Sequence, residues 1–209
     1  MKYESIDSKL FIKNRANFSR EMKKNSIAFF NSNDIYPVSA DSTLPFEQHR
    51  DIFYLSGIDQ EESILVLCPD NPNPDLREIL FLKETNDHIA VWEGPKINKT
   101  QALEISGIKT VFWLKDLEKL VDKLVSTCHN IYFNKNEHYR AKIETETREA
   151  RFNSWLEKKY PKKNKERSNP ILQRLRSVKD HKEISLIQQA CDITNKGFRR
   201  ILGFVKPGV

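Results

Sequence analysis

The sequence has no long apolar run and no apolar segment behind its first residues. Nothing in its 209 residues approaches the roughly 18 consecutive apolar residues that cross a bilayer. The start, Met1 to Glu4, lacks the apolar region of a secretory signal peptide. We therefore expect a cytoplasmic protein without a membrane partner.

Cysteine is also scarce. The three cysteines, Cys68, Cys128 and Cys191, are odd in number and far apart in the sequence. A disulfide framework would need an even set, and a structural zinc site would show paired Cys-x-x-Cys motifs. Neither pattern is present, so we expect each thiol to pack as a small apolar side chain.

Glycine motifs and catalytic histidine patterns are missing as well. The chain has six glycines, and none belongs to a Gly-x-Gly-x-x-Gly or P-loop pattern, which argues against a nucleotide site. Ser56 lacks the Gly-x-Ser-x-Gly frame of a nucleophile elbow. His49, His129 and His138 stand apart from one another, and we expect His49 at a strand edge and the other two at the surface.

Charge is abundant and slightly basic, with a net charge of +6. Much of the basic excess lies in residues 158–167, beside Pro161. A charge run next to a proline favours a solvated linker. The alternative is a nucleic-acid-binding arm, whose affinity would fall steeply with salt because neutralised phosphates release counterions.

Apolar spacing predicts the first half of the chain to be one helix followed by strands. The pattern over residues 8–23 is helical, with Ser8 as its cap. Runs of β-branched and aromatic residues predict strands at 26–30, 52–55, 64–68, 79–82 and 89–92. Residues 84–87 read as a hairpin turn between the last two.

After residue 98, short strands alternate with helices. Helices are expected at 100–106, 117–125 and 140–159, and strands at 110–113 and 130–133. The whole pattern predicts an α/β fold, with a mixed β-sheet covered by helices on both faces.

The final section reads as the start of a second domain. Asp180 with Glu183 fits a helix N-cap with its acidic partner. Apolar residues then recur at three- and four-residue spacing for about six turns, and such a stripe must be buried against something. We therefore divide the chain into an amino-terminal domain, 1–170, and a linker with the first helix of another domain, 171–209.

Three segments carry a family resemblance, in order along nearly the whole chain. They are residues 45–57 (PFEQHRDIFYLSG), residues 79–82 with the Trp-x-Gly turn of 91–95 (VWEGP), and residues 172–190 with Lys-Pro-Gly at 206–208. Together they resemble the Xaa-Pro aminopeptidase branch of the creatinase, prolidase and aminopeptidase P superfamily. Arg50, Ile52 and Pro95 depart from the residues usual there.

The resemblance implies a full-length metallopeptidase with a pita-bread catalytic domain. Two metal ions, usually Mn²⁺, would be held by two Asp, one His and two Glu, all expected beyond Val209. A bridging water would attack the peptide bond before a penultimate proline, because paired metals lower its pKa and polarise the carbonyl. This chain would then hold no catalytic or metal-binding residue. It would be inert alone, would supply homo-oligomer contacts and would control access to the active site.

Trp92 is the one site residue that the resemblance assigns here. In related enzymes the tryptophan on this turn reaches the active site of the neighbouring subunit. The alternative is an aromatic side chain packed at a strand end. For the whole protein, the alternatives are a prolidase-type dipeptidase and a non-catalytic, peptidase-like module that binds proteins. Creatinase-type amidine hydrolysis is less expected.

Overall fold

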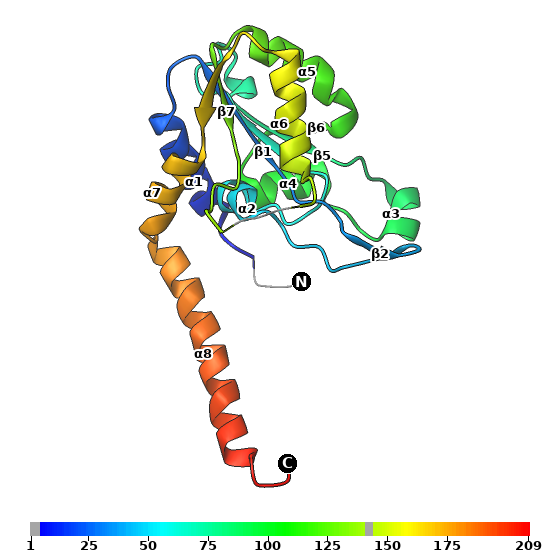
Figure 1. Cartoon of the computed structure of the whole chain (residues 1–209), viewed down its shortest axis with the longest axis vertical. Coiled ribbons are helices and arrows are strands. Elements are labelled where there is room, and N and C mark those ends of the chain that lie inside the picture. The colour runs from blue at the N-terminus through cyan, green and yellow to red at the C-terminus, as the bar shows by residue number, and fades with distance from the viewer. Residues whose placement is uncertain (1–4, 141–143) are drawn as a thin grey trace. The chain divides into compact units, whose positions relative to one another are not determined.

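The computed structural model describes residues 5–140 and 144–209. The chain divides into two compact units, Met1–Leu175 and Arg176–Val209. Each unit is described by itself. Figure 1 follows the chain from its blue N-terminal helix to its red C-terminal one.

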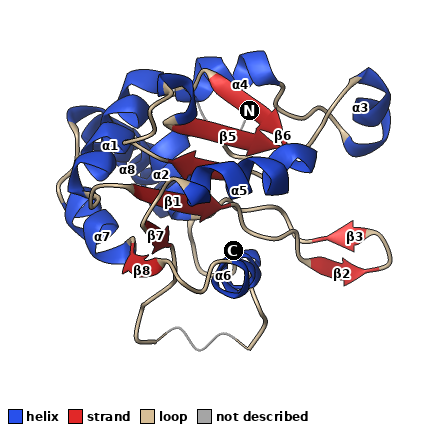
Figure 2. Cartoon of the chain, turned by 90° about the horizontal axis from the view of Figure 1, so that it is seen from above, coloured by secondary structure: helices blue, strands red, loops and turns tan. Residues whose placement is uncertain are grey.

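The first unit is built on a six-stranded mixed sheet, drawn in red in Figure 2, with strand order β6-β5-β4-β1-β7-β8. β4 pairs antiparallel with both β1 and β5, whereas β5–β6, β1–β7 and β7–β8 are parallel pairs. The strands are β1 (Ser26–Asn31), β4 (Ile64–Leu67), β5 (Glu78–Leu82), β6 (Thr110–Trp113), β7 (Asn130–Phe133) and β8 (Asn164–Arg167).

Helices cover both faces of the sheet. Alternate residues of β1 show this division: Ala28 and Phe30 pack on one side, and Ile27 and Phe29 on the other. One face carries α1 (Ser8–Glu21), α2 (Arg50–Ser56), α4 (Lys99–Ser106) and α7 (Asn169–Ser177), and the other carries α5 (Leu117–Ser126) and α6 (Arg148–Lys159). Because both faces are buried, the central strands are continuously apolar. The expected fold class is confirmed.

Four smaller elements lie outside the sheet. A separate hairpin pairs β2 (Pro37–Ser39) with β3 (Ser42–Thr43). A short helix, α3 (Asp87–Glu93), lies between β5 and α4, and two 3₁₀ turns span Pro74–Leu76 and Leu114–Asp116.

Two expected strands are helices. Residues 52–55 belong to α2, where the His49 side chain accepts a hydrogen bond from the Asp51 amide and Gly57 ends the helix at φ 70°. His49 is therefore a helix cap and not a strand-edge residue. Residues 89–92 belong to α3, whose cap is Asn86, so residues 84–87 are not a hairpin turn. Short apolar runs do not distinguish a strand from a helix, and here the capping residues show that both segments are helices.

Three further expectations need correction. The cap of α1 is Asp7, not Ser8, because its carboxylate accepts from the Lys9 amide. The helix expected at 140–159 starts only at Arg148, behind the Thr147 cap, and the part of that prediction at residues 141–143 lies outside the described residues. Residues 164–167 of the expected linker form the edge strand β8.

The second unit consists mainly of α8 (His181–Phe204). Its predicted cap is confirmed: Asp180 accepts from the Lys182 amide at 2.9 Å, and Glu183 accepts from the Asp180 amide at 2.8 Å. Its apolar stripe is exposed, with Ile184, Phe198 and Leu202 among its members. Within the described residues, no helix is both long and apolar enough to cross a bilayer.

Candidate functional site

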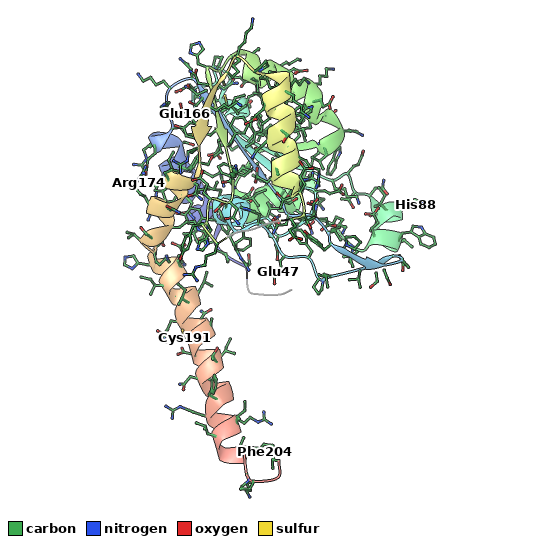
Figure 3. All side chains as sticks on the ribbon, viewed as in Figure 1. Glu47, His88, Glu166, Arg174, Cys191 and Phe204 are labelled. Carbon is green, nitrogen blue, oxygen red and sulfur yellow. The ribbon has the colours of Figure 1, made fainter. Side chains whose placement is uncertain are left out.

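The helix α3 presents the most exposed large apolar side chain in the described part of the chain. Trp92 is 82% exposed and its neighbour Val91 is 76% exposed. No other side chain of α3 is buried either. Figure 3 shows His88, on α3, at the periphery of the first unit. Trp92 is therefore presented to solvent on a helix, and it is not packed at a strand end.

The local sequence sets both ends of α3. Asn86 accepts a hydrogen bond from the Ile89 amide over 2.9 Å and so caps the first turn. Gly94 follows the helix at φ +75°, a backbone conformation that side chains with a Cβ rarely adopt. Pro95 then prevents further helical hydrogen bonding. These signals limit α3 to two turns.

Two lysines hold the ends of residues 83–97, the α3 segment, against the domain. Lys83 Nζ lies 2.7 Å from Glu93 Oε2 and 3.1 Å from Glu62 Oε2. The hydrogen bond from Lys83 lowers the pKa of Glu93 and the same contact raises the pKa of Lys83. At the other end, Lys96 pairs with Glu61. Sequence reasoning missed these residues, because no local pattern links positions that lie so far apart in the chain.

Buried amides support the loop beneath the segment. The Ile97 amide donates to Gln60 Oε1 over 2.6 Å. Gln48 Nε2 donates in turn to the carbonyl oxygens of Ile58 and Gln60, at 3.0 and 2.9 Å. Gln48 is the glutamine of the first segment that carries the family resemblance, and here its role is to order the loop that receives α3.

A second exposed apolar group lies near α3. The β2–β3 hairpin and its flanks carry Tyr36, Val38 and Leu44, each largely exposed. Figures 1 and 2 both place this hairpin at the same end of the first unit as α3. Exposed apolar side chains therefore occur on both of these elements at that end of the domain.

One buried carboxyl group lies at the ends of β1 and β7. Glu149, at the start of α6, accepts from Asn31 Nδ2 over 3.1 Å and from Asn134 Nδ2 over 3.5 Å. Burial raises the pKa of Glu149 to about 8. The cluster joins α6 to the sheet through protein groups alone, and we assign it a structural role.

The residues available for metal binding do not fit a metal pair. Across residues 5–140 and 144–209, no group of three or more His, Cys, Asp or Glu side chains could hold an ion. Cys68 and Cys128 are buried, as expected of small apolar side chains, but Cys191 is exposed, so the same expectation is wrong for it.

Known proteins similar to this chain point to one family. The family described as "Aminopeptidase P, N-terminal domain" matches residues 11–132. Human Xaa-Pro aminopeptidase 3 is 27% identical over 170 residues, which cover 80% of this chain and 33% of the human protein. The chain thus spans about a third of that curated relative.

Solved structures agree on the fold. A Bacillus anthracis structure assigned to aminopeptidase P matches with a TM-score of 0.83 and 26% identity, covering 92% of this chain and 46% of that one. A structure of Escherichia coli aminopeptidase P is described as zinc-substituted and in complex with product. It matches with a TM-score of 0.77 and 20% identity, and the match covers 99% of this chain and 47% of that one.

Proposed function

The chain belongs to the aminopeptidase P N-terminal domain family, and from this premise we propose that it is the non-catalytic amino-terminal domain of a peptidase that removes the N-terminal residue before a penultimate proline. The family match over residues 11–132 carries the proposal. The shared fold covers 92% of this chain but only 46% of the Bacillus anthracis chain, which supports the proposal that this chain is part of a longer enzyme.

The two Mn²⁺ ions of the proposed enzyme would be held outside these residues. Metal pairs in hydrolases need several carboxylate and imidazole ligands converging on one point. No such group occurs among the described side chains. We therefore assign the metals and the chemical step to the catalytic domain, and the 209-residue chain alone should be inactive.

For this domain we propose two roles, homo-oligomer contact and control of access to the active site. Trp92 is the proposed contact residue, reaching the active-site entrance of a neighbouring subunit. Its exposure supports this role, because an apolar ring of that size gains free energy when a partner removes it from water. The exposed Val91 beside it enlarges the apolar contact.

The remainder of the chain is proposed to lead into the catalytic domain. We assign residues 1–170 to the amino-terminal domain and 171–209 to the linker and the first catalytic-domain helix. The exposed stripe of α8, which includes Ile187 and Ile201, supports this assignment because it needs a partner surface.

We propose no nucleic-acid partner. Much of the basic run is already neutralised within the domain: Lys165 pairs with Glu157, Lys159 with Asp122, and Arg167 with Glu137. Cations held by carboxylates on the same surface offer little net charge to phosphates.

The experiment compares the 209-residue chain with the whole protein encoded by its reading frame, in Mn²⁺. Substrates are an Xaa-Pro tripeptide, an Xaa-Pro dipeptide and a tripeptide without proline. Release from the Xaa-Pro tripeptide by the whole protein alone is the expected result. If the whole protein cleaves only the dipeptide, it is a prolidase and not an aminopeptidase. If it cleaves none of the three substrates, it is a non-catalytic binding module. Cleavage by the 209-residue chain would disprove its proposed inactivity.

A further inference from the structure

Three consecutive residues between α2 and β4 each bind a different point of the α3 segment. Gln60 accepts from the Ile97 amide over 2.6 Å, Glu61 pairs with Lys96, and Glu62 lies 3.1 Å from Lys83 Nζ. Lys83 also bonds Glu93 on α3 itself. We call this set the α3 clamp: Gln60, Glu61, Glu62, Lys83, Lys96 and Ile97.

The Glu61–Lys96 pair is the better protected of the two ion pairs that join the receiving loop to the segment. Their side chains are only 10% and 17% exposed, whereas those of Lys83 and Glu62 are 32% and 39% exposed. Exposed ion pairs contribute little because water and salt screen them. A pair that is largely withdrawn from water is screened less, and removing one partner leaves the other poorly solvated. Of the two lysines, Lys96 should therefore contribute more to fixing the segment.

The backbone of the receiving loop is held in an unusual conformation. Glu62 has φ 51°, in the left-handed region that residues with a Cβ seldom occupy. Such a conformation persists only where its surroundings hold it, and it is concentrated at functional sites. Here Gln48 provides the support, since its buried amide donates to the carbonyl oxygens of Ile58 and Gln60.

We propose that the α3 clamp positions Trp92 for its partner, with Lys96 and Lys83 as positioning residues. This inference rests on the proposed role of Trp92 and adds how the ring is presented. An exposed helix of two turns is not stable alone, so without the clamp the segment samples many orientations. With the clamp the ring is preorganised, which lowers the entropy lost on contact.

The test measures backbone order in the 209-residue chain by ¹⁵N relaxation. In the unchanged chain we expect an order parameter of about 0.85 at the Trp92 amide, the value of rigid backbone. Lys96→Met should lower it to below about 0.6, the range of flexible backbone. Lys96→Arg, which keeps the charge, should restore most of the order. Lys165→Met is the matched control. Lys165 is an exposed lysine on the edge strand β8, and it pairs with Glu157 of α6 and not with the clamp.

Amides of β1 and β4 report whether the whole fold loosens. A drop confined to residues 83–97 supports the clamp. An unchanged value in Lys96→Met, a flexible Trp92 in the unchanged chain, or an equal drop in the strands would overturn it. The result does not depend on catalysis. A further outcome is that the order parameter at Trp92 falls in Lys96→Met as expected while Trp92→Ala leaves peptide cleavage by the whole protein unchanged. That result would disprove the proposed role of Trp92 and leave the clamp supported.

Discussion

The Sγ atoms of Cys68 and Cys128 lie 3.4 Å apart, although the two residues are 60 positions apart in the sequence. Cys68 follows β4 and Cys128 follows α5, so the contact joins the sheet to the helix that covers it. The hydrogen bond with Cys128 and burial both raise the pKa of the Cys68 thiol. Because the thiolate is the reactive form, Cys68 should be inert despite its close neighbour.

Thiol accessibility gives the first prediction. A disulfide reagent should label one thiol per native chain, Cys191, and three after denaturation, because Cys68 and Cys128 are buried and Cys191 is exposed. Colorimetric thiol titration measures this count. Cys191→Ser is the control and should reduce the native count to zero. Two fast thiols in the native chain would contradict the burial of the pair.

Gly57→Ala should destabilise the domain by about 2–4 kcal/mol. Gly57 has φ +70°, and a Cβ there would lie 2.3 Å from Cε2 of the buried Phe11 ring. Left-handed backbone and overpacking therefore both oppose the new methyl group. Urea denaturation monitored by circular dichroism measures the change.

The matched control for that change is Gly197→Ala. Gly197 lies inside α8, and apart from its chain neighbours and the backbone of its own helix no heavy atom lies within 4 Å of the position of its missing Cβ. Alanine favours helix over glycine by about 1 kcal/mol, so this variant should be as stable as the original or more so. An equal loss of stability in Gly57→Ala and Gly197→Ala would contradict the steric explanation for Gly57.

Glu149 should make stability depend on pH. Burial raises the pKa of Glu149 from 4.5 to about 8, so between these values the folded chain binds a proton that the unfolded chain releases. The contribution of this group to the free energy of unfolding is therefore complete below pH 4.5 and is lost as pH rises toward 8. The limiting slope is about 1.4 kcal/mol per pH unit.

Glu149→Gln keeps the shape of the side chain and removes this titration. Urea denaturation of both chains from pH 5 to 8 should show that the free energy of unfolding of the variant increases relative to that of the original chain as pH rises. Asn31 Oδ1 and Asn134 Oδ1 are buried without a hydrogen-bond partner in the described structure, so a protonated carboxyl has acceptors nearby. Parallel pH profiles for the two chains would refute the raised pKa.

Much of the sheet could be predicted from sequence because its strands are buried on both faces. The apolar runs of β1, β4, β5 and β7 stand out for that reason. The cap of α8 was also predictable, since a capping box is a local signal. By contrast, β8 is polar and lies at a sheet edge, so its sequence carries no strand pattern.

The site was only partly predictable. Family resemblance singled out Trp92, but its four-residue apolar run fits a strand as well as a helix. The helix follows from Asn86 and Gly94 acting as caps, and its position follows from Lys83 and Lys96. These lysines contact partners that lie far from them in the sequence, and a single sequence gives no sign of such pairs.

The most direct test of the account is the catalytic efficiency of Trp92→Ala in the whole protein. Because Trp92 is 82% exposed, the change should alter the free energy of unfolding by less than about 0.5 kcal/mol. We expect kcat/KM for an Xaa-Pro tripeptide in Mn²⁺ to fall about tenfold, equivalent to about 1.4 kcal/mol of lost contact in the transition state. An unchanged kcat/KM with an unchanged fold would contradict the assignment of this domain to active-site access.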